Sequence, residues 1–342
     1  PRMRRGNAPL FVAALLARAA AHVGGAVSPA KYLIVATPTP AKVAYVRVRR
    51  GGGIQSAWRG GGSELTSLIG AGLVRPTGVA VEQISRRLIV ADPGAKRISA
   101  YPLWTHEGML FAGAPVALAQ DVEAEGVATD GSGNIFFTDA ANNRVLRIRA
   151  SQALRAAPVS QVVYEGDASP AYVRAPAGLA ADSFYAYWAN HGNGSEDGSI
   201  VRGLERPAPV TPRDDPNVAA LVESVSAPTG ICVAVDNVYY ARADASIYGV
   251  KKAGGAPVAI SDKLVNPRGC AWDGAGTVYV ADQGADAIYS FAGNMRALGA
   301  AQLAKAADVE GAVGVAVFSG ARSRRAAATL GLGTLLAAAA AW

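Results

Sequence analysis

A glycine followed by small apolar residues recurs six times along this chain, and this repeat restricts the possible folds more than any other feature of the sequence. The six glycines are 39 to 52 residues apart and lie at Gly78, Gly126, Gly178, Gly230, Gly269 and Gly314. A period in this range is typical of arrays in which each repeat forms one supersecondary unit and packs against its neighbours. We refer to these positions as the repeat glycines.

Two further apolar runs follow each of the first five repeat glycines. The first run occupies residues 88–92, 135–139, 186–190, 238–242 and 278–282. The second occupies residues 97–101, 144–148, 199–202, 246–250 and 287–291. The runs are short, rich in β-branched and aromatic residues and bounded by turn residues, as strands joined by hairpins are. With a looser fourth run, each repeat predicts a four-stranded antiparallel sheet, and radial repetition of such sheets gives a β-propeller.

The sixth repeat is incomplete at the C-terminal end of the chain. Residues 314–318 supply its first strand, and the strands that should follow have their counterparts near the N-terminus, at residues 33–37 and 42–46. We therefore expect an all-β, six-bladed β-propeller closed by N- and C-terminal strands that share the last blade, with Ile34 beside Val315 and its neighbours. Closure of this kind removes the exposed strand edges of an open ring.

Several of these runs resemble known propeller repeats. Residues 137–148 and 280–284 are similar to the NHL repeat, and residues 187–202 of the third blade are similar to the YWTD-type repeat. The resemblance covers residues 31–318 and places the chain near the SMP-30/TolB-like propellers. It implies the architecture but no particular activity, because such folds carry many unrelated functions.

The positive charge of the chain is concentrated at its two ends. The formal net charge is +7, and seven arginines with no acidic residue lie within residues 1–27 and 320–342. The segment between them holds 26 basic and 26 acidic residues. A nucleic-acid partner needs a surplus of basic residues, so we expect none. With only 17% charged and 51% hydrophobic residues, the composition also excludes an intrinsically disordered chain.

The two ends have the composition of targeting segments. Residues 1–27 combine a cationic start, a short apolar run and small residues near Ala26, which predicts a signal peptide, with a buried helix as the alternative. Residues 320–342 combine a basic spacer with an apolar tail, which predicts a GPI-type signal with lipid attachment near Ser319. A tail-anchor helix and a free extension are the alternatives. The propeller domain is thus expected at 28–319, on the extracellular face of the cell surface, reached through the secretory pathway.

Polar residues mark the points where the first strands begin and the second strands end. These points share one face of a propeller, so we expect a polar ring around one mouth of the central channel. The candidates for ligand binding there are Asp92, Glu125, Asp139, Asn190, His191, Arg242, Arg268 and Asp282. A structural alternative for Asp92, Asp139, Asn190 and Asp282 is that their side chains cap the following turns.

The catalytic families with this fold match the chain poorly. A resemblance to the SMP-30/gluconolactonase type implies a divalent cation such as Ca²⁺ at Glu125, but the equivalent positions of the other blades include Ala177, Thr229 and Arg268. Hard cations need several oxygen ligands. The amidating-lyase type needs a histidine cluster, and the strictosidine-synthase type implies a catalytic Glu that Glu125 matches loosely. We therefore expect no catalytic residue, cofactor or metal; a metal-dependent lactonase or arylesterase using Glu125 and His191 is the alternative.

Two further features bear on an extracellular protein. Asn193 begins an Asn-Gly-Ser sequon in a glycine-rich loop, which predicts N-glycosylation. Cys232 and Cys270 follow consecutive repeat glycines, so they can face each other as a disulfide or lie apart as two small buried side chains.

The function expected from these features is non-catalytic recognition at the cell surface. The expected partners are a protein, peptide or glycan, bound at the channel mouth or at the long connections 102–125 and 205–227. A structural role in a larger assembly is a further alternative. We expect the protein to attach to the membrane only through the lipid anchor or the C-terminal tail.

Overall fold

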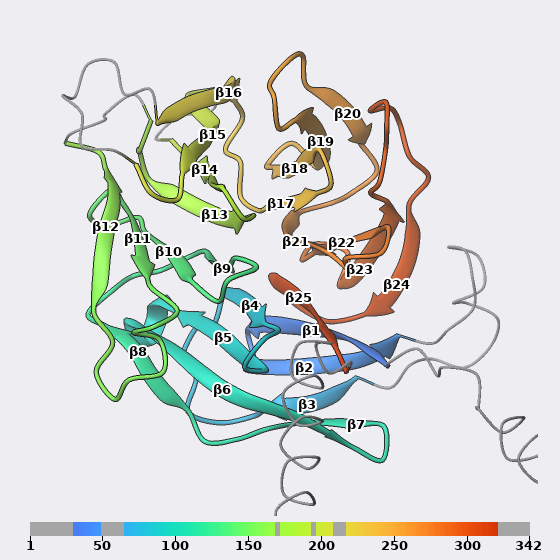
Figure 1. Ribbon diagram of the computed structural model, residues 1–342. Helices are drawn as coiled ribbons and strands as arrows, with labels where there is room; N and C mark the ends of the chain where they lie inside the picture. Colours follow the sequence, from blue (N-terminus) through green and yellow to red (C-terminus); the bar gives the residue numbers. More distant parts are fainter. Residues whose placement is uncertain (1–29, 49–64, 168–171, 193–195, 208–216, 321–342) are drawn as a thin grey trace, which may run out of the picture.

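The structure is a computed structural model that describes residues 30–48, 65–167, 172–192, 196–207 and 217–320. These residues form six antiparallel sheets arranged like blades around a central channel (Figure 1). The expected all-β, six-bladed propeller is confirmed. A single turn of 3₁₀ helix, η2 (Pro93–Ala95), is the one helical element among the described residues. Within that part of the chain, no helix is long and apolar enough to cross a membrane.

The first five blades follow each other along the chain. Blade 1 contains β4 (Gly78–Glu82), β5 (Arg87–Asp92), β6 (Arg97–His106), β7 (Met109–Ala112) and β8 (Val116–Gln120). Blade 2 contains β9 (Val127–Thr129), β10 (Ile135–Asp139), β11 (Arg144–Ile148) and β12 (Ser160–Glu165). Blade 3 contains β13 (Pro176–Ala181), β14 (Tyr185–Asn190), β15 (Gly198–Leu204) and β16 (Val218–Val225). Blade 4 contains β17 (Ile231–Ala234), β18 (Asn237–Arg242), β19 (Ser246–Lys251) and β20 (Val258–Ser261). Blade 5 contains β21 (Pro267–Trp272), β22 (Thr277–Asp282), β23 (Ala287–Ala292) and β24 (Ala304–Asp308).

Blade 6 joins the two ends of the described chain. It contains β25 (Gly314–Ser319), β1 (Lys31–Pro38), β2 (Ala41–Val48) and β3 (Thr66–Ile69), in that spatial order. β1 runs antiparallel to β25 with Val35 opposite Val315, and Figure 1 shows the two strands, blue and red, side by side. The predicted closure of the ring across the chain ends is therefore confirmed.

The repeat glycines are required by close packing around the channel. A Cβ atom added at any of the six would lie within 3 Å of the carbonyl oxygen that precedes the repeat glycine of the next blade. The contacts run round the ring without a gap, because Gly314 of blade 6 meets the carbonyl of Thr77 in blade 1. Only glycine has no side chain to place in that space, which explains why the repeat begins with this residue.

The core lies between neighbouring blades. The second strand of each blade is buried almost along its full length, as Tyr187 and Trp188 of β14 are, each with 0% exposure. Such strands are covered on both faces, so their sequences are nearly continuous apolar runs. Between blades 4 and 5, Cys232 and Cys270 form a disulfide with 5.5 Å between their Cα atoms.

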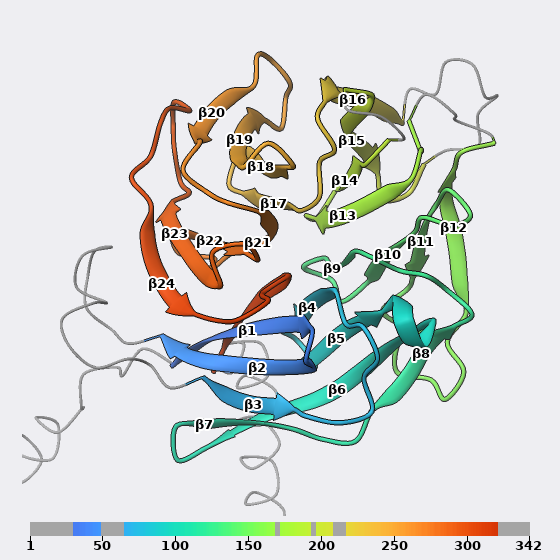
Figure 2. The ribbon, with the colours of Figure 1, turned by 180° about the vertical axis from the view of Figure 1, so that it is seen from behind.

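A hairpin from blade 1 covers blade 6. β6 extends beyond the blade and pairs with β7, and both views show β7 lying along β3 (Figures 1 and 2). The hydroxyl of Tyr32 donates to the carbonyl of Gly108 over 3.0 Å, and the Leu110 N–H donates to the hydroxyl of Tyr45 over 3.2 Å. Part of the connection 102–125 therefore belongs to the core, where Leu103 and Leu110 are buried beside these tyrosines.

Three of the predictions made from sequence fall on residues that the structure does not describe. The signal peptide of residues 1–27, the apolar tail beyond Gly320 and the sequon at Asn193 all lie outside the described residues. Ser319, the expected site of lipid attachment, is the last residue of β25 and lies opposite Lys31 of β1.

Candidate functional site

The channel opens at one face of the propeller into a cavity of about 420 Å³. Its walls consist of the six repeat glycines and the residues next to them, which leaves backbone and small apolar side chains around most of the ring. Four charged or imidazole side chains line this surface: Arg75, Glu125, His191 and Arg268. We call this cavity the mouth.

Arg75 and Glu125 form an ion pair across the junction of blades 1 and 2. The guanidinium Nη2 of Arg75 lies 3.0 Å from Oε1 of Glu125, and both side chains remain partly exposed. The hydroxyl of Thr77 donates to the backbone carbonyl of Glu125 over 3.2 Å, which ties the two blades together beside the pair. The one carboxylate among the lining residues is therefore engaged by an arginine.

Arg268 lies on the wall opposite Glu125. The two residues precede the repeat glycines of blades 5 and 2, which are three positions apart in a ring of six. The Nε–H of Arg268 donates to Oε1 of Gln283 over 3.0 Å, which holds the guanidinium in place. The mouth thus has one arginine beside Glu125 and a second arginine facing it.

His191 stands at the exposed rim of the mouth. Its backbone N–H donates to the carbonyl of Ala175 over 3.0 Å, and its ring Nδ1 lies 3.4 Å from the carbonyl of Pro228 in the next blade. The imidazole therefore links blades 3 and 4, and Glu125 belongs to blade 2.

Five of the eight residues predicted at the mouth do not line it: Asp92, Asp139, Asn190, Arg242 and Asp282. Three of them are buried and accept backbone N–H groups from the segment that leads into the first strand of their own blade. Asp92 accepts from Val74 and Arg75, each over 2.8 Å. In blade 5 Asp282 accepts from Val265 and Asn266, and in blade 3 Asn190 accepts from Arg174. This is a structural role, although Asp92 thereby positions the backbone of Arg75.

Asp139 and Arg242 are also occupied away from the mouth. Asp139 accepts from the side-chain amide of Asn142 over 2.8 Å, and its buried Oδ1 has no hydrogen-bond partner among the described residues. Arg242 pairs with Asp244 at 2.6 Å and lies over the ring of Tyr248. Neither side chain can contact a ligand in the mouth without leaving these positions.

The donor groups of the mouth do not fit a divalent cation. Calcium takes six to eight oxygen ligands, several of them carboxylates. The lining residues offer the single carboxylate of Glu125, and Arg75 already neutralises it. In the described part of the chain, no group of three or more His, Cys, Asp and Glu side chains is placed to hold a metal ion.

Arg75 is the mouth residue that the sequence analysis missed. It lies two residues before Thr77, outside the positions that the strand pattern places at the mouth. The sequence feature that could have identified Arg75 was its position close to a repeat glycine, in a chain whose central segment has no net charge.

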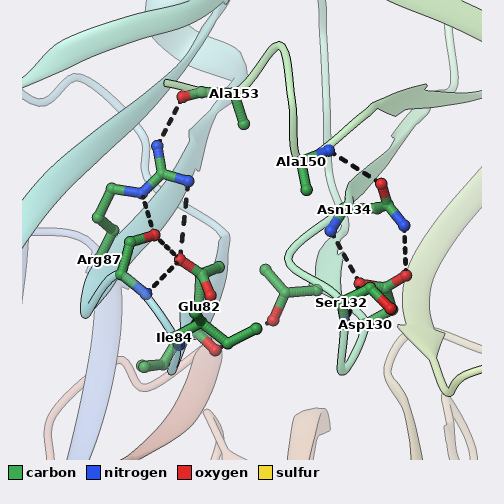
Figure 3. A network of polar contacts seen from close by, with 11 residues as sticks. Glu82, Ile84, Arg87, Asp130, Ser132, Asn134, Ala150 and Ala153 are labelled. Carbon is green, nitrogen blue, oxygen red and sulfur yellow. Dashed lines mark hydrogen bonds and ion pairs between the residues drawn. The ribbon is translucent and has the colours of Figure 1, made fainter. Parts of the chain in front are cut away.

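The face opposite the mouth is held together by carboxylates at the turns between first and second strands. Figure 3 shows two of these turns, where Glu82 accepts from the Ile84 N–H and Asp130 from the Ser132 N–H, each over 2.8 Å. Arg87 links blade 1 to blade 2, because its Nη1 donates to the carbonyl of Ala153 over 2.6 Å. These residues position the turns and line no part of the mouth.

Comparison with known proteins identifies the fold. No protein-family model and no curated protein matches the chain. Among solved structures, a chain of a nidogen–laminin complex aligns with a TM-score of 0.62 at 15% identity, over 85% of this chain and 99% of that one. A gluconolactonase of Xanthomonas campestris aligns at 0.49 and 13% identity (70% and 78% covered), and a streptogramin B lyase at 0.49 and 14% (86% and 95%). Identities this low show a shared fold alone, and that fold is a six-bladed β-propeller.

Proposed function

We propose that this chain is a non-catalytic recognition protein whose mouth binds a protein segment bearing an acidic side chain. The observation that carries the proposal is the charge arrangement of the mouth. Arg75 and Glu125 neutralise each other on one side, and Arg268 faces them from the other. The ligand carboxylate would lie against Arg268, whose planar guanidinium suits a carboxylate.

The shape of the mouth supports a protein segment as the ligand. A volume of about 420 Å³ is at the lower end of the range for small-molecule sites and suits a few inserted side chains. The backbone around the repeat glycines offers polar groups for a ligand main chain, and the wall side chains Val79, Leu179 and Ile231 offer apolar contact. The structure that aligns at 0.62 was determined as part of a protein–protein complex.

The metal-dependent hydrolase alternative has less support in this geometry. Its proposed residues, Glu125 and His191, belong to blades 2 and 3, and Arg75 holds the Glu125 carboxylate. A carboxylate that already pairs with a guanidinium would have to give up that contact to bind calcium.

The proposal is tested by panning a phage library of disulfide-closed random heptapeptides against the full chain. We expect enriched peptides to share an Asp or Glu, and the Arg268→Gln variant to bind them at least about tenfold more weakly, the effect of losing one charge-assisted contact. Arg296 is exposed and does not line the mouth, so the control variant Arg296→Gln should bind as the wild type does.

Two results would argue against the proposal. Enriched peptides that bind the Arg268→Gln variant unchanged would show that the mouth is not their site. Hydrolysis of a lactone or aryl ester that requires added Ca²⁺ and is lost in Glu125→Gln would favour the hydrolase.

We also propose that the protein acts at the cell surface, on the strength of its two terminal sequences. Mass spectrometry of the mature protein tests this by fixing both ends. Loss of residues before about 28 and a lipid near Ser319 are the expected results. A mature protein that retains both termini would overturn the scheme.

A further inference from the structure

A second cavity opens on the face opposite the mouth, between blades 2 and 3. Its volume is about 660 Å³. Three basic side chains line it: Arg147, Arg149 and Arg206. Arg147 is in β11, Arg149 directly follows that strand, and Arg206 lies two residues after β15. We call it the arginine cavity.

Arg147 is the buried member of this set. It is 8% exposed, and its Nη1 donates to the backbone carbonyl of Glu205. Its Nη2 lies 3.4 Å from Oε1 of Gln161, and its Nε has no hydrogen-bond partner among the described residues. A buried guanidinium donor without an acceptor is costly, so this Nε is available to an anion that enters the cavity.

The charges of the arginine cavity have no carboxylate counterpart among the residues that the structure describes. Within the described ranges, none of the three guanidinium groups forms an ion pair with an acidic side chain. Burial and the nearby charges of Arg149 and Arg206 lower the pKa of Arg147. Burial and the facing Asp130 raise the pKa of Glu205, whose backbone carbonyl accepts from Arg147, to about 8.

We propose that the arginine cavity binds a ligand carrying clustered sulfate or phosphate groups. Guanidinium groups bind such oxyanions through paired, charge-assisted hydrogen bonds. Arg149 and Arg206 are exposed at the cavity opening and Arg147 lies deeper, so that a ligand with two or more anionic groups can contact all three. The side chains of Val162 and Pro207 add an apolar wall for the scaffold that carries these groups.

This site is independent of the mouth. The mouth is built where first strands begin, whereas Asn134 precedes a second strand and Arg149 follows a third, at the other end of the blades. Figure 3 shows the Asp130 turn that fixes Asn134 at the edge of the arginine cavity. Binding at one cavity can therefore be tested with the other intact.

The experiment measures binding of two probes to the full chain by calorimetry at pH 7 and low salt. Tripolyphosphate represents phosphate-bearing ligands, and a trisulfated heparin disaccharide represents sulfated glycans. The test variant is the double substitution Arg149→Gln and Arg206→Gln, since both side chains are exposed and their loss leaves the core unchanged. The control is Lys263→Gln with Arg296→Gln, which removes two exposed charges from blade 5 and the loop before it.

We expect at least one probe to bind, with the tighter one identifying the source of the ligand. The test variant should bind it at least about tenfold more weakly and the control within about twofold. Equal weakening in both variants would assign binding to the overall charge of the protein and overturn the proposal. The proposal would also be overturned if neither probe binds. Unchanged binding by Arg268→Gln separates this result from the proposal for the mouth.

Discussion

Glu205 occupies in blade 3 the position that Lys252 occupies in blade 4. Each donates its backbone N–H to the carbonyl of the residue before the second strand, Phe184 and Asp236 respectively, over 2.9 and 2.8 Å. The side chain of Lys252 pairs with Asp182 of the preceding blade at 2.8 Å. Glu205 instead faces the carboxyl of Asp130 in its preceding blade, which helps burial to raise the pKa of Glu205. One blade junction thus has an ion pair where the next has a pair of acids.

The ion pair between blades 3 and 4 should stabilise the fold. Burial alone would raise the pKa of Asp182, but hydrogen bonds from Lys252, the Phe184 and Tyr185 N–H groups and the Tyr187 hydroxyl hold it below its usual value. We expect Lys252→Met to lower the free energy of unfolding by about 2 kcal/mol, because a partly buried carboxylate loses its cation. Urea denaturation at pH 7 measures this change.

Lys305→Met is the matched control for that measurement. Lys305 pairs with Asp308 within one strand, and both side chains are exposed. Exposed pairs contribute little to stability, so the urea midpoint should stay where it is. Equal shifts for the two variants would contradict a specific role for Lys252.

The acid pair between blades 2 and 3 should make stability fall as the pH rises. The pKa of Glu205 is raised from 4.5 to about 8 by burial and by the facing carboxylates of Asp130 and Asp182, against the charge of Arg147. Between these values the folded state binds more protons than the unfolded state, so stability decreases from about pH 5 to pH 8. Glu205→Gln cannot ionise, and we expect its Tm at pH 8.5 to exceed that of the wild type by about 5 °C.

Calorimetric unfolding of both proteins at pH 5, 7 and 8.5 checks this expectation. The difference in Tm should be smallest at pH 5, where Glu205 is protonated in the folded protein. Parallel pH profiles for the two proteins would show that Glu205 does not control this part of the curve.

The repeat glycines provide a third test. A Cβ at Gly230 would overlap the carbonyl of Arg268 and the backbone of Gly269. We expect Gly230→Ala to destabilise the protein by about 3 kcal/mol, since the backbones of two blades would have to separate. Gly299→Ala is the control, because no atom lies within 4 Å of its added Cβ. Urea unfolding should leave that variant close to the wild type.

The strand pattern was sufficient to predict the ring and where its mouth would lie. Repeat glycines and buried second strands are imposed by backbone packing, so they are visible as fixed residue types and continuous apolar runs. The same topology brought Glu125 and Arg268 to one cavity. It did not show in which direction the side chains point. Asp92 and Asp282 point away from the mouth because they accept hydrogen bonds from nearby backbone N–H groups.

The hairpin of β6 and β7 could not be predicted from the sequence, for a different reason. Pro102 normally marks the end of a strand, because it has no N–H to donate. Here β6 continues past Pro102, pairs with β7 and packs against Tyr32 and Tyr45 of blade 6. The apolar residues that identify this contact lie far apart in the sequence, and only the closed ring brings them together.

The disulfide between blades 4 and 5 should contribute strongly to stability. Cys232 and Cys270 are 38 residues apart, and closing a loop of that length in the unfolded chain is worth about 4 kcal/mol in the chain-entropy treatment. We expect the double variant Cys232→Ala and Cys270→Ala to be less stable by up to that amount. The wild type unfolded in the presence of a reductant should approach the same stability, whereas the variant should not respond to it. Thiol titration of the denatured wild type without reductant should detect no free thiol; two free thiols would mean that the bridge does not form, and that blades 4 and 5 rely on their apolar contacts alone.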